Sequence, residues 1–349
     1  MSNANLGWLF YKDYFKDIDW KNLKTNKENI EKEINKKVDK LINTSPLIVE
    51  EEPLGNITFK ATTIYPGLLL GSGYLHELPS IEGQAILGFD FDYTTGLPII
   101  RGSSIKGALR RAFKETKYIQ EIIEKEFSTK EIKELEIEIF GQENSSSEVE
   151  RGKDIFFDAR VISKGIKLLE DDYLAPHGDN PLKNPQPLRF IKVAPGVTFR
   201  FDFKLHDGLL TKKEKALLFA EILYDLGLGA KTNVGYGKFD EKLTKEKVKR
   251  QIQEREEELK KQQEDRERAL KEKEKEEKLK ELGPLEAIKF QMQNLENKEI
   301  YELLKNTQLS EDEKKEVENF VLSKIGPKPT KSTPAKRKWA IKIYEFFGK

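Results

Sequence analysis

The feature that most limits how this chain folds is a highly charged segment at residues 241–282. Lys, Arg, Asp and Glu occupy 29 of its 42 positions, with 15 basic and 14 acidic side chains. A segment of this composition cannot bury a hydrophobic core. Opposite charges three and four positions apart favour a single solvated helix, because such neighbours pair on a helix surface. Weak self-association is the alternative, but too few leucines are present for a sustained coiled-coil seam.

The charged segment divides the chain into three predicted parts. Residues 1–240 form a folded domain with an N-terminal extension, 241–282 a helical linker, and 283–349 a small helical unit in which apolar periodicity returns. The last stretch, from Gly326, is basic and carries Trp339 at helical spacing from later apolar residues. We expect this stretch to dock on the helical unit, with RNA contact as the alternative.

The composition excludes several classes of protein. The 349 residues include no Cys, which rules out disulfides, thiolate zinc sites and cysteine nucleophiles and favours a reducing, cytoplasmic setting. No window approaches the roughly 20 apolar residues that span a bilayer, and the N-terminus lacks a secretory pattern. We therefore expect no membrane partner. No cofactor is indicated either.

Hydrophobic patterning within residues 54–240 predicts an α+β fold. Period-two alternation predicts strands, and apolar residues at i, i+3, i+4 and i+7 predict amphipathic helices. Thr211 and Glu214 form a capping box before the second helix, which Gly227 can end. The predicted order is a strand at 57–65, a helix at 101–113, strands at 154–162 and 197–205, a helix at 216–226 and a strand at 234–239. This β-α-β-β-α-β order is the ferredoxin-like (RRM-like) plan.

A glycine-rich loop, GLGAKTNVGYG at 227–237, joins the second predicted helix to the last strand. Glycines allow positive φ and close approach of a phosphate chain to the backbone, while Lys231, Thr232 and Asn233 offer a cation and hydrogen-bond donors. The spacing matches neither the P-loop nor the Rossmann fingerprint. A flexible connection without a ligand is the alternative.

A second candidate is the start of the helix in RGSSIKGALRR. Residues 101–117 hold six basic side chains and one Glu, whereas residues 54–240 as a whole hold 25 basic and 27 acidic ones. Ser103 or Ser104 would cap the helix, and the N-terminal amides would favour an anion. Lys106, Arg110, Lys114 and Lys117 share one stripe, which suits a sugar-phosphate backbone. A capped helix with a solvated basic side is the alternative.

These two motifs resemble those of a known family. TGLPIIRGSSIKGALRRAF followed far downstream by GLGAKTNVGYGKF is similar to the RAMP superfamily of CRISPR-Cas proteins. With NLGWLFYKDY, DIFFDARV and LLEDDYLAPHGDNPLKNPQPLRFIKVAPGVTFRF, the likeness narrows to the sixth-subunit family of the type III-B Cmr effector complex. The resemblance covers roughly residues 5–240 and implies a ferredoxin-like domain.

The resemblance also implies a function and partners. A subunit of this kind holds crRNA near its 3′ end, at the head of an RNA-guided antiviral complex, beside the repeated slicing subunit and the first Cmr subunit. The arm at 163–187 would lie towards guide and target RNA. The residues expected to contact RNA are Arg101, Ser103, Ser104, Lys106, Arg110, Lys114, His76, His177, Gly227, Gly229, Lys231, Thr232, Asn233, Gly235, Tyr236 and Gly237.

Catalysis by this chain is not expected. The three histidines are dispersed in sequence, and no His pair or His-carboxylate cluster has metal-ligand spacing. The first alternative is a ribonuclease of the same superfamily that processes crRNA or cuts target, using His76, Asp90 or Asp92. The second is an RNA-recognition-motif protein that stacks bases on sheet aromatics, although VTFRFDFKL does not match that module's pattern.

Overall fold

The computed structural model describes residues 5–23, 25–49, 51–76, 88–127, 131–143, 149–174, 187–240, 245–329 and 338–349. The chain forms two compact units, Met1–Leu259 and Lys260–Lys349. The first unit therefore ends beyond Asp240, where the sequence pattern placed the domain boundary. A single helix, α7 (Lys245–Glu281), crosses from the first unit into the second.

The first unit is built on a five-stranded antiparallel sheet. Its strands run in the order β1 (Ile57–Thr62), β9 (Thr198–Lys204), β6 (Ala159–Ser163) and β2 (Ile99–Ile100), and β5 (Ile155–Phe156) also pairs with β9. Strand β9 is central because it pairs with β1, β6 and β5, and its alternating phenylalanines place large apolar side chains on one face. This confirms the predicted strand at 197–205.

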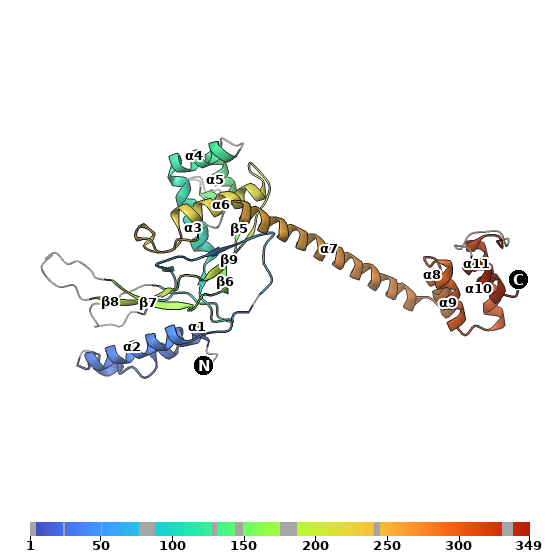
Figure 1. Cartoon of the computed structure of the whole chain (residues 1–349), viewed down its shortest axis with the longest axis horizontal. Helices are drawn as coiled ribbons and strands as arrows, with labels where there is room; N and C mark the ends of the chain where they lie inside the picture. Colours follow the sequence, from blue (N-terminus) through green and yellow to red (C-terminus); the bar gives the residue numbers. More distant parts are fainter. Residues whose placement is uncertain are drawn as a thin grey trace. The chain divides into compact units, whose positions relative to one another are not determined.

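Four helices cover the phenylalanine face of the sheet. They are α3 (Gly102–Lys114), α4 (Thr116–Glu126), α5 (Ile132–Phe140) and α6 (Lys212–Leu226), and they gather on one side of the sheet in Figure 1. Phe59, Phe199, Phe201 and Phe203 are at most 1% exposed beneath them. The predicted capping box of Thr211 and Glu214 is present at the start of α6.

The predicted last strand forms only in part. Thr232–Val234 is a 3-10 turn, and Phe239 makes a single antiparallel bridge to Thr63 beside β1. The α+β class is confirmed. The complete four-stranded ferredoxin-like sheet stays a prediction, because its fourth strand is represented by this bridge alone among the described residues.

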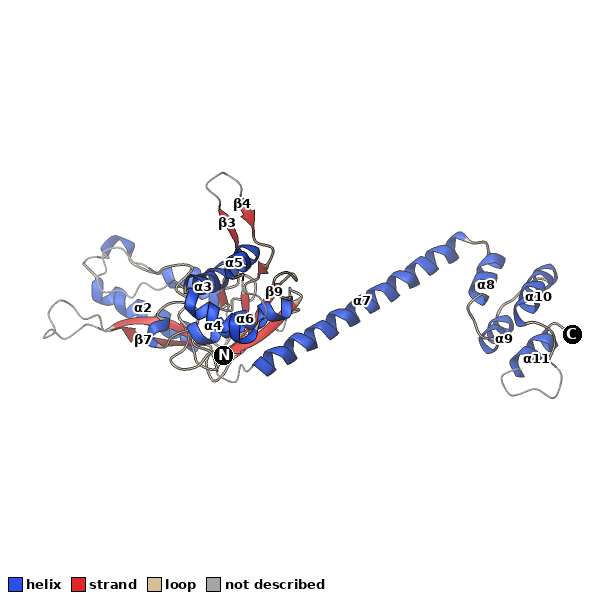
Figure 2. Ribbon diagram, turned by 90° about the horizontal axis from the view of Figure 1, so that it is seen from above, coloured by secondary structure: helices blue, strands red, loops and turns tan. Residues whose placement is uncertain are grey.

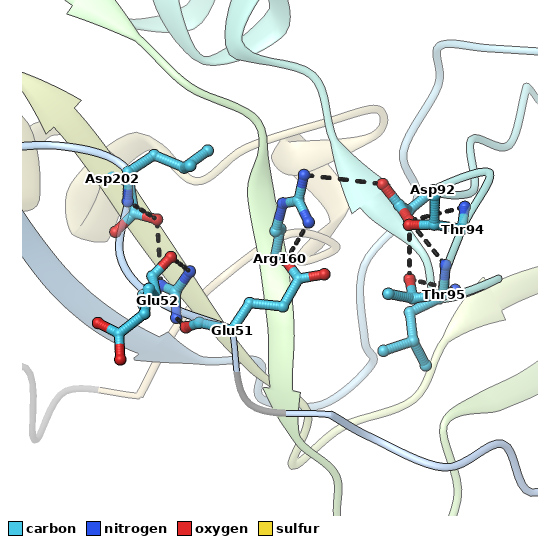
Figure 3. Close-up of polar contacts among 10 residues, drawn as sticks. Glu51, Glu52, Asp92, Thr94, Thr95, Arg160 and Asp202 are labelled. Carbon is cyan, nitrogen blue, oxygen red and sulfur yellow. Dashed lines mark hydrogen bonds and ion pairs between the residues drawn. The ribbon is translucent and has the colours of Figure 1, made fainter.

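The opposite face of the sheet is polar and covered by the chain itself. Arg200 and Asp202 on β9 are 4% and 1% exposed and form an ion pair of 3.1 Å. The Arg200 guanidinium also donates to the carbonyl oxygens of Glu51 and Glu52 in the segment before β1. Figure 3 shows this segment beside Arg160, which pairs with Glu51 and with Asp92.

The start of α7 packs on the same unit. Val248 and Ile252 are 1% exposed, and Arg255 donates to the carbonyl oxygens of Pro53 and Gly55. The charged segment therefore contains a short apolar and hydrogen-bonding face at its beginning, which its average composition conceals.

The remaining elements of the first unit surround the sheet. Helix α1 (Leu6–Tyr11) is capped by Asn5, and α2 (Lys27–Asn43) lies along the β7–β8 hairpin (Leu169–Leu174 and Leu188–Val193). A second hairpin, β3–β4 (Gly141–Glu143 and Val149–Arg151), follows α5 and is visible in Figure 2. Short 3-10 turns at Asp13–Phe15 and Trp20–Asn22 connect α1 to α2.

The second unit is helical, as the returning apolar periodicity predicted. After the end of α7 it contains α8 (Pro284–Met292), α9 (Asn297–Asn306), α10 (Glu311–Ile325) and α11 (Lys338–Phe346). Its buried core consists of Met292, Ile300, Leu304, Val317, Val321 and Ile343. Ile343 belongs to this core, so α11, at the end of the basic C-terminal stretch, docks on the helical unit. None of the described helices is both long and apolar enough to cross a membrane.

Candidate nucleic-acid interface

The glycine-rich loop is held against the segment that follows β1. The amide of Ala230 donates to Leu69 O at 2.8 Å, and the amide of Gly237 donates to Gly67 O at 2.8 Å. Within the loop, the amide of Leu228 donates to Gly237 O at 2.9 Å. These bonds fix the loop backbone, so it is a defined structure and not merely a flexible connection.

Two of the loop glycines serve this packing. A Cβ on Gly229 would lie 2.1 Å from Leu69 O, and one on Gly237 would lie 1.8 Å from Leu228 O. Both residues have positive φ, at +90° and +73°. Their close approach is therefore to the chain's own backbone, a role that the sequence reading gave to a ligand. Gly235 differs, because its nearest neighbour is Pro66 Cδ at 3.5 Å.

The tip of the loop carries unengaged polar side chains. Lys231 adopts a left-handed conformation with φ of +58° before the turn Thr232–Val234. Within the described part of the chain, the side chains of Lys231, Thr232 and Asn233 make no hydrogen bond or ion pair. A cation, a hydroxyl and an amide are thus available together on a fixed backbone.

The exposed side chain of Tyr65 adds an aromatic surface that sequence reading missed. Tyr65 is 83% exposed and Val234 is 65% exposed. Pro66, which follows Tyr65, is the nearest neighbour of Gly235 in the loop. An exposed aromatic ring suits stacking on a nucleobase. In sequence Tyr65 continued a strand pattern, so nothing marked it as a surface residue.

Tyr236 ties the loop to the β7–β8 hairpin. Its hydroxyl donates to Asp172 Oδ2 at 2.7 Å, and Lys192 Nζ donates to the same oxygen at 2.7 Å. Burial raises the pKa of Asp172, but the hydrogen bonds from Lys192 and Tyr236 outweigh this effect and hold the pKa below its usual range. The Tyr236 hydroxyl, predicted to contact RNA, is therefore occupied within the protein.

The N-terminus of α3 is also occupied within the protein. The amide of Gly102 donates to Asp158 Oδ1 at 2.7 Å, so Asp158 caps the helix, and neither Ser103 nor Ser104 does. Arg101 pairs with Asp90 at 2.6 Å and with Asp158 at 3.2 Å. The predicted anion site thus already holds a carboxylate. Asp90 acts here as the partner of Arg101.

The basic stripe on α3 is partly engaged. Arg110 lies 3.7 Å from Glu136 and donates to Gly141 O at 3.3 Å, and Lys106 Nζ lies 5.9 Å from the ring centre of Phe156. Lys114 is exposed and has no partner among the described residues. The stripe and the glycine-rich loop share no hydrogen bond or ion pair in the described chain.

His76 is a packing residue in this structure. Its ring stacks between Phe10 and Tyr14, with ring centres 3.7 Å and 3.6 Å away, and Nε2 lies 2.9 Å from Phe10 O. Burial lowers the pKa of His76 to about 4, and the contact with Phe10 O only partly offsets this. A neutral, stacked imidazole is poorly placed to contact phosphate. His177 lies outside the described residues.

Among the described residues, the candidate catalytic groups His76, Asp90 and Asp92 share no hydrogen bond or ion pair with one another. Asp92 accepts hydrogen bonds from the backbone and hydroxyl groups of Thr94 and Thr95 and pairs with Arg160, as Figure 3 shows. Burial raises the pKa of Asp92, but these hydrogen bonds keep it below its usual range. His206 lies beside Asp154, at 3.5 Å. Among the described residues no group of three His, Asp or Glu side chains could hold a metal ion.

The RNA-recognition-motif alternative is not supported by the sheet. The aromatic side chains that would stack bases in such a module lie under the helices and are buried. The other face of the sheet is closed by the ion pair of Arg200 with Asp202 and by the segment before β1. Within the part of the sheet that the structure describes, neither face offers an open aromatic platform.

Comparison with known proteins identifies the family. The family model of the RAMP superfamily matches residues 60–240, which is more than half of the chain. The CRISPR system Cmr subunit Cmr6 of Pyrococcus furiosus is 34% identical over 121 residues, covering 30% of this chain. The matched part spans 34% of that relative, about a third of its length.

Two solved structures are also similar. The type III-B Cmr-beta complex bound to cognate target RNA contains a chain with 21% identity and a TM-score of 0.44, matched over 67% of this chain and 84% of that one. The crystal structure of Cmr6 from Pyrococcus furiosus has 26% identity and a TM-score of 0.31, matched over 52% and 95%. The family match and the Cmr6 relative confirm the resemblance inferred from the two motifs. The chain belongs to the RAMP superfamily.

Proposed function

We propose that this protein is a crRNA-binding subunit of a type III-B Cmr effector complex, without a cutting site of its own. It would sit near the 3′ end of the guide at the head of the complex, in contact with target RNA, the repeated slicing subunit and the first Cmr subunit. The family match and the Cmr6 relative support membership of such a complex.

The tip of the glycine-rich loop carries the proposal. Its backbone is hydrogen-bonded to residues 67–69, while Lys231, Thr232 and Asn233 have no partner in the described chain. A fixed backbone with free donors recognises a sugar-phosphate chain without reading its sequence. Base identity would then be left to pairing between guide and target.

The basic stripe on α3 is a second surface of the same proposal. Lys114 is its most available charge, since Arg110 already contacts Glu136 and Gly141 O. We leave the N-terminus of α3 out of the proposed contacts. Gly102 N already donates a hydrogen bond to Asp158, and Arg101 already forms an ion pair with Asp90.

The test is a triple substitution at the loop tip, Lys231→Ala with Thr232→Ala and Asn233→Ala. We expect crRNA affinity to fall roughly tenfold, because hydrogen bonds to charged groups contribute about 1.5–3 kcal/mol. The slope of log affinity against log salt should decrease by about 0.7, the value for one phosphate contact on a single strand. Fluorescence anisotropy with labelled crRNA at several salt concentrations measures both.

The matched control is Lys204→Ala, which removes an exposed lysine at the end of β9. This variant should keep the affinity and the slope of the unmodified protein. An unchanged affinity in the triple variant, or an equal loss in the control, would show that the loop tip does not hold the guide.

A further inference from the structure

The second unit carries a pair of aromatic rings covered by lysines. Tyr301 on α9 and Trp339 on α11 lie with their ring centres 5.7 Å apart. Lys342 Nζ lies 4.6 Å from the ring centre of Trp339 and 5.5 Å from that of Tyr301, and Lys298 Nζ lies 5.9 Å from Trp339. Helices α9 and α11 are neighbours in both Figure 1 and Figure 2. We call these four residues the aromatic-lysine face.

The core of the unit fixes the position of this face. Ala340 and Ile343 on α11 are 4% and 0% exposed, and Ile300 on α9 is 0% exposed. Trp339 directly precedes the buried Ala340, and Lys342 directly precedes the buried Ile343. Both therefore lie on the half-exposed side of α11, next to its buried side. The rings are thus held by packing beneath them while their outer parts meet solvent.

The positive charge of the face is not neutralised by carboxylates. In the described part of the unit, Lys298, Lys338 and Lys342 have no acidic partner. Other lysines of the unit do: Lys289 pairs with Glu316, and Lys314 with Glu311, each at 2.7 Å.

The sequence before α11 adds more positive charge. The stretch TKSTPAKR at 330–337 contains Lys331, Lys336 and Arg337 and no acidic residue. It leads directly into Lys338 and Trp339. In the sequence, basic residues are therefore concentrated directly before Trp339, whose ring meets that of Tyr301.

We propose that the aromatic-lysine face binds single-stranded RNA. The ammonium groups of Lys298 and Lys342 would neutralise phosphates, and the rings of Tyr301 and Trp339 would stack on bases without regard to their identity. An acidic protein partner would use the lysines but would leave the paired rings without a role. The site lies outside residues 60–240, the part matched by the family. It therefore shares no residue with the glycine-rich loop.

The test uses the fluorescence of Trp339 in the full chain. The protein has three tryptophans, and Trp8 and Trp20 are 52% and 49% exposed, so Trp8→Phe and Trp20→Phe leave Trp339 as the sole reporter. Titration with oligouridylate at low salt should quench this fluorescence. The same quench should appear when the loop-tip triple substitution is also present, which separates this site from the proposed guide site.

Charge removal gives the second readout. Lys298→Gln with Lys342→Gln should weaken the oligouridylate affinity measured by the quench roughly tenfold and lower the salt slope by about 1.4, at about 0.7 per phosphate. The control Lys315→Gln removes an exposed lysine of α10 and should change neither. Far-ultraviolet circular dichroism should show unchanged helix content in both variants.

Three results would overturn the proposal. The first is RNA binding by anisotropy with no change in Trp339 fluorescence, which would show that RNA binds away from the aromatic-lysine face. The second is an equal loss in the Lys315→Gln control. The third is quenching of Trp339 by polyglutamate but not by oligouridylate, which would assign the face to an acidic protein partner.

Discussion

The N-terminus of α3 and the glycine-rich loop have the same sequence signature and opposite structural outcomes. Both combine glycine, hydroxyl groups and a cation. At α3 these groups already have partners within the protein. Gly102 N donates a hydrogen bond to Asp158, and Arg101 forms ion pairs with both Asp158 and Asp90. In the loop the protein binds the backbone and leaves the side chains at the tip free.

The difference shows that donors in a sequence indicate a ligand only when the fold leaves them unpaired. A carboxylate at a helix N-terminus satisfies the same amides and dipole that would attract a phosphate. Asp158 comes 56 residues after Gly102, so inspection of the RGSSIKG motif could not identify it. Substitutions can test this comparison, because some remove groups that are packed or bonded within the protein and others remove groups that are free at its surface.

The largest effect is expected for Gly229→Ala. The new Cβ would lie 2.1 Å from Leu69 O at a residue whose φ is +90°. Overpacking costs roughly 1–3 kcal/mol and left-handed strain about 1–2 kcal/mol, so the free energy of unfolding should fall by about 4 kcal/mol. Urea denaturation measures this loss.

Gly235→Ala is the matched control for Gly229→Ala. It has the same positive φ problem, at +98°, but the nearest atom to its Cβ is 3.5 Å away. It should therefore cost only about 1–2 kcal/mol, from strain alone. Equal destabilisation by the two substitutions would mean that contact with Leu69 O does not hold the loop in place.

A somewhat smaller effect is expected from the titration of His76. Burial lowers its folded-state pKa to about 4, whereas the unfolded chain protonates it near 6.5. The unfolded state therefore binds more protons between these values, and stability falls as the pH drops from 6.5 to 4. A shift of this size contributes about 3 kcal/mol.

His76→Phe should remove this part of the pH dependence, because phenylalanine keeps the stack on Phe10 and Tyr14 but does not titrate. Urea unfolding at pH 7.5 and pH 4.5 gives the comparison. His206→Gln, at a ring whose side chain is 46% exposed, is the control and should follow the unmodified protein. If His76→Phe retains the full pH dependence, the buried imidazole is not its source.

Local patterns predicted much of this fold because their causes are local. The alternation at 197–205 and the capping box of Thr211 and Glu214 are set by neighbours in sequence, and both appear in the structure. Contacts between distant segments were not predictable in this way. His76 reads as a lone loop histidine until Phe10 and Tyr14 are seen on either side of it.

The boundary of the first unit shows the same limit. The charge of residues 241–282 predicts a solvated helix, yet Val248, Ile252 and Arg255 dock on the unit. Two apolar residues one turn apart are enough to bury a helix start when the sheet offers a complementary surface. A shortened form of the first unit should therefore end after Leu259, since ending at Asp240 removes these contacts.

The smallest difference in stability is expected between Asp158→Ala and Thr232→Ala. Loss of the helix cap costs about 1 kcal/mol, and loss of the half-exposed pair with Arg101 adds at most about 1 kcal/mol. Thr232→Ala, at the loop tip, should leave the free energy of unfolding unchanged within about 0.5 kcal/mol. Urea denaturation of the two variants thus measures the difference between an internal and an external polar group. If Asp158→Ala is as stable as Thr232→Ala, the amides of α3 do not depend on Asp158, and its N-terminus again becomes a candidate phosphate site.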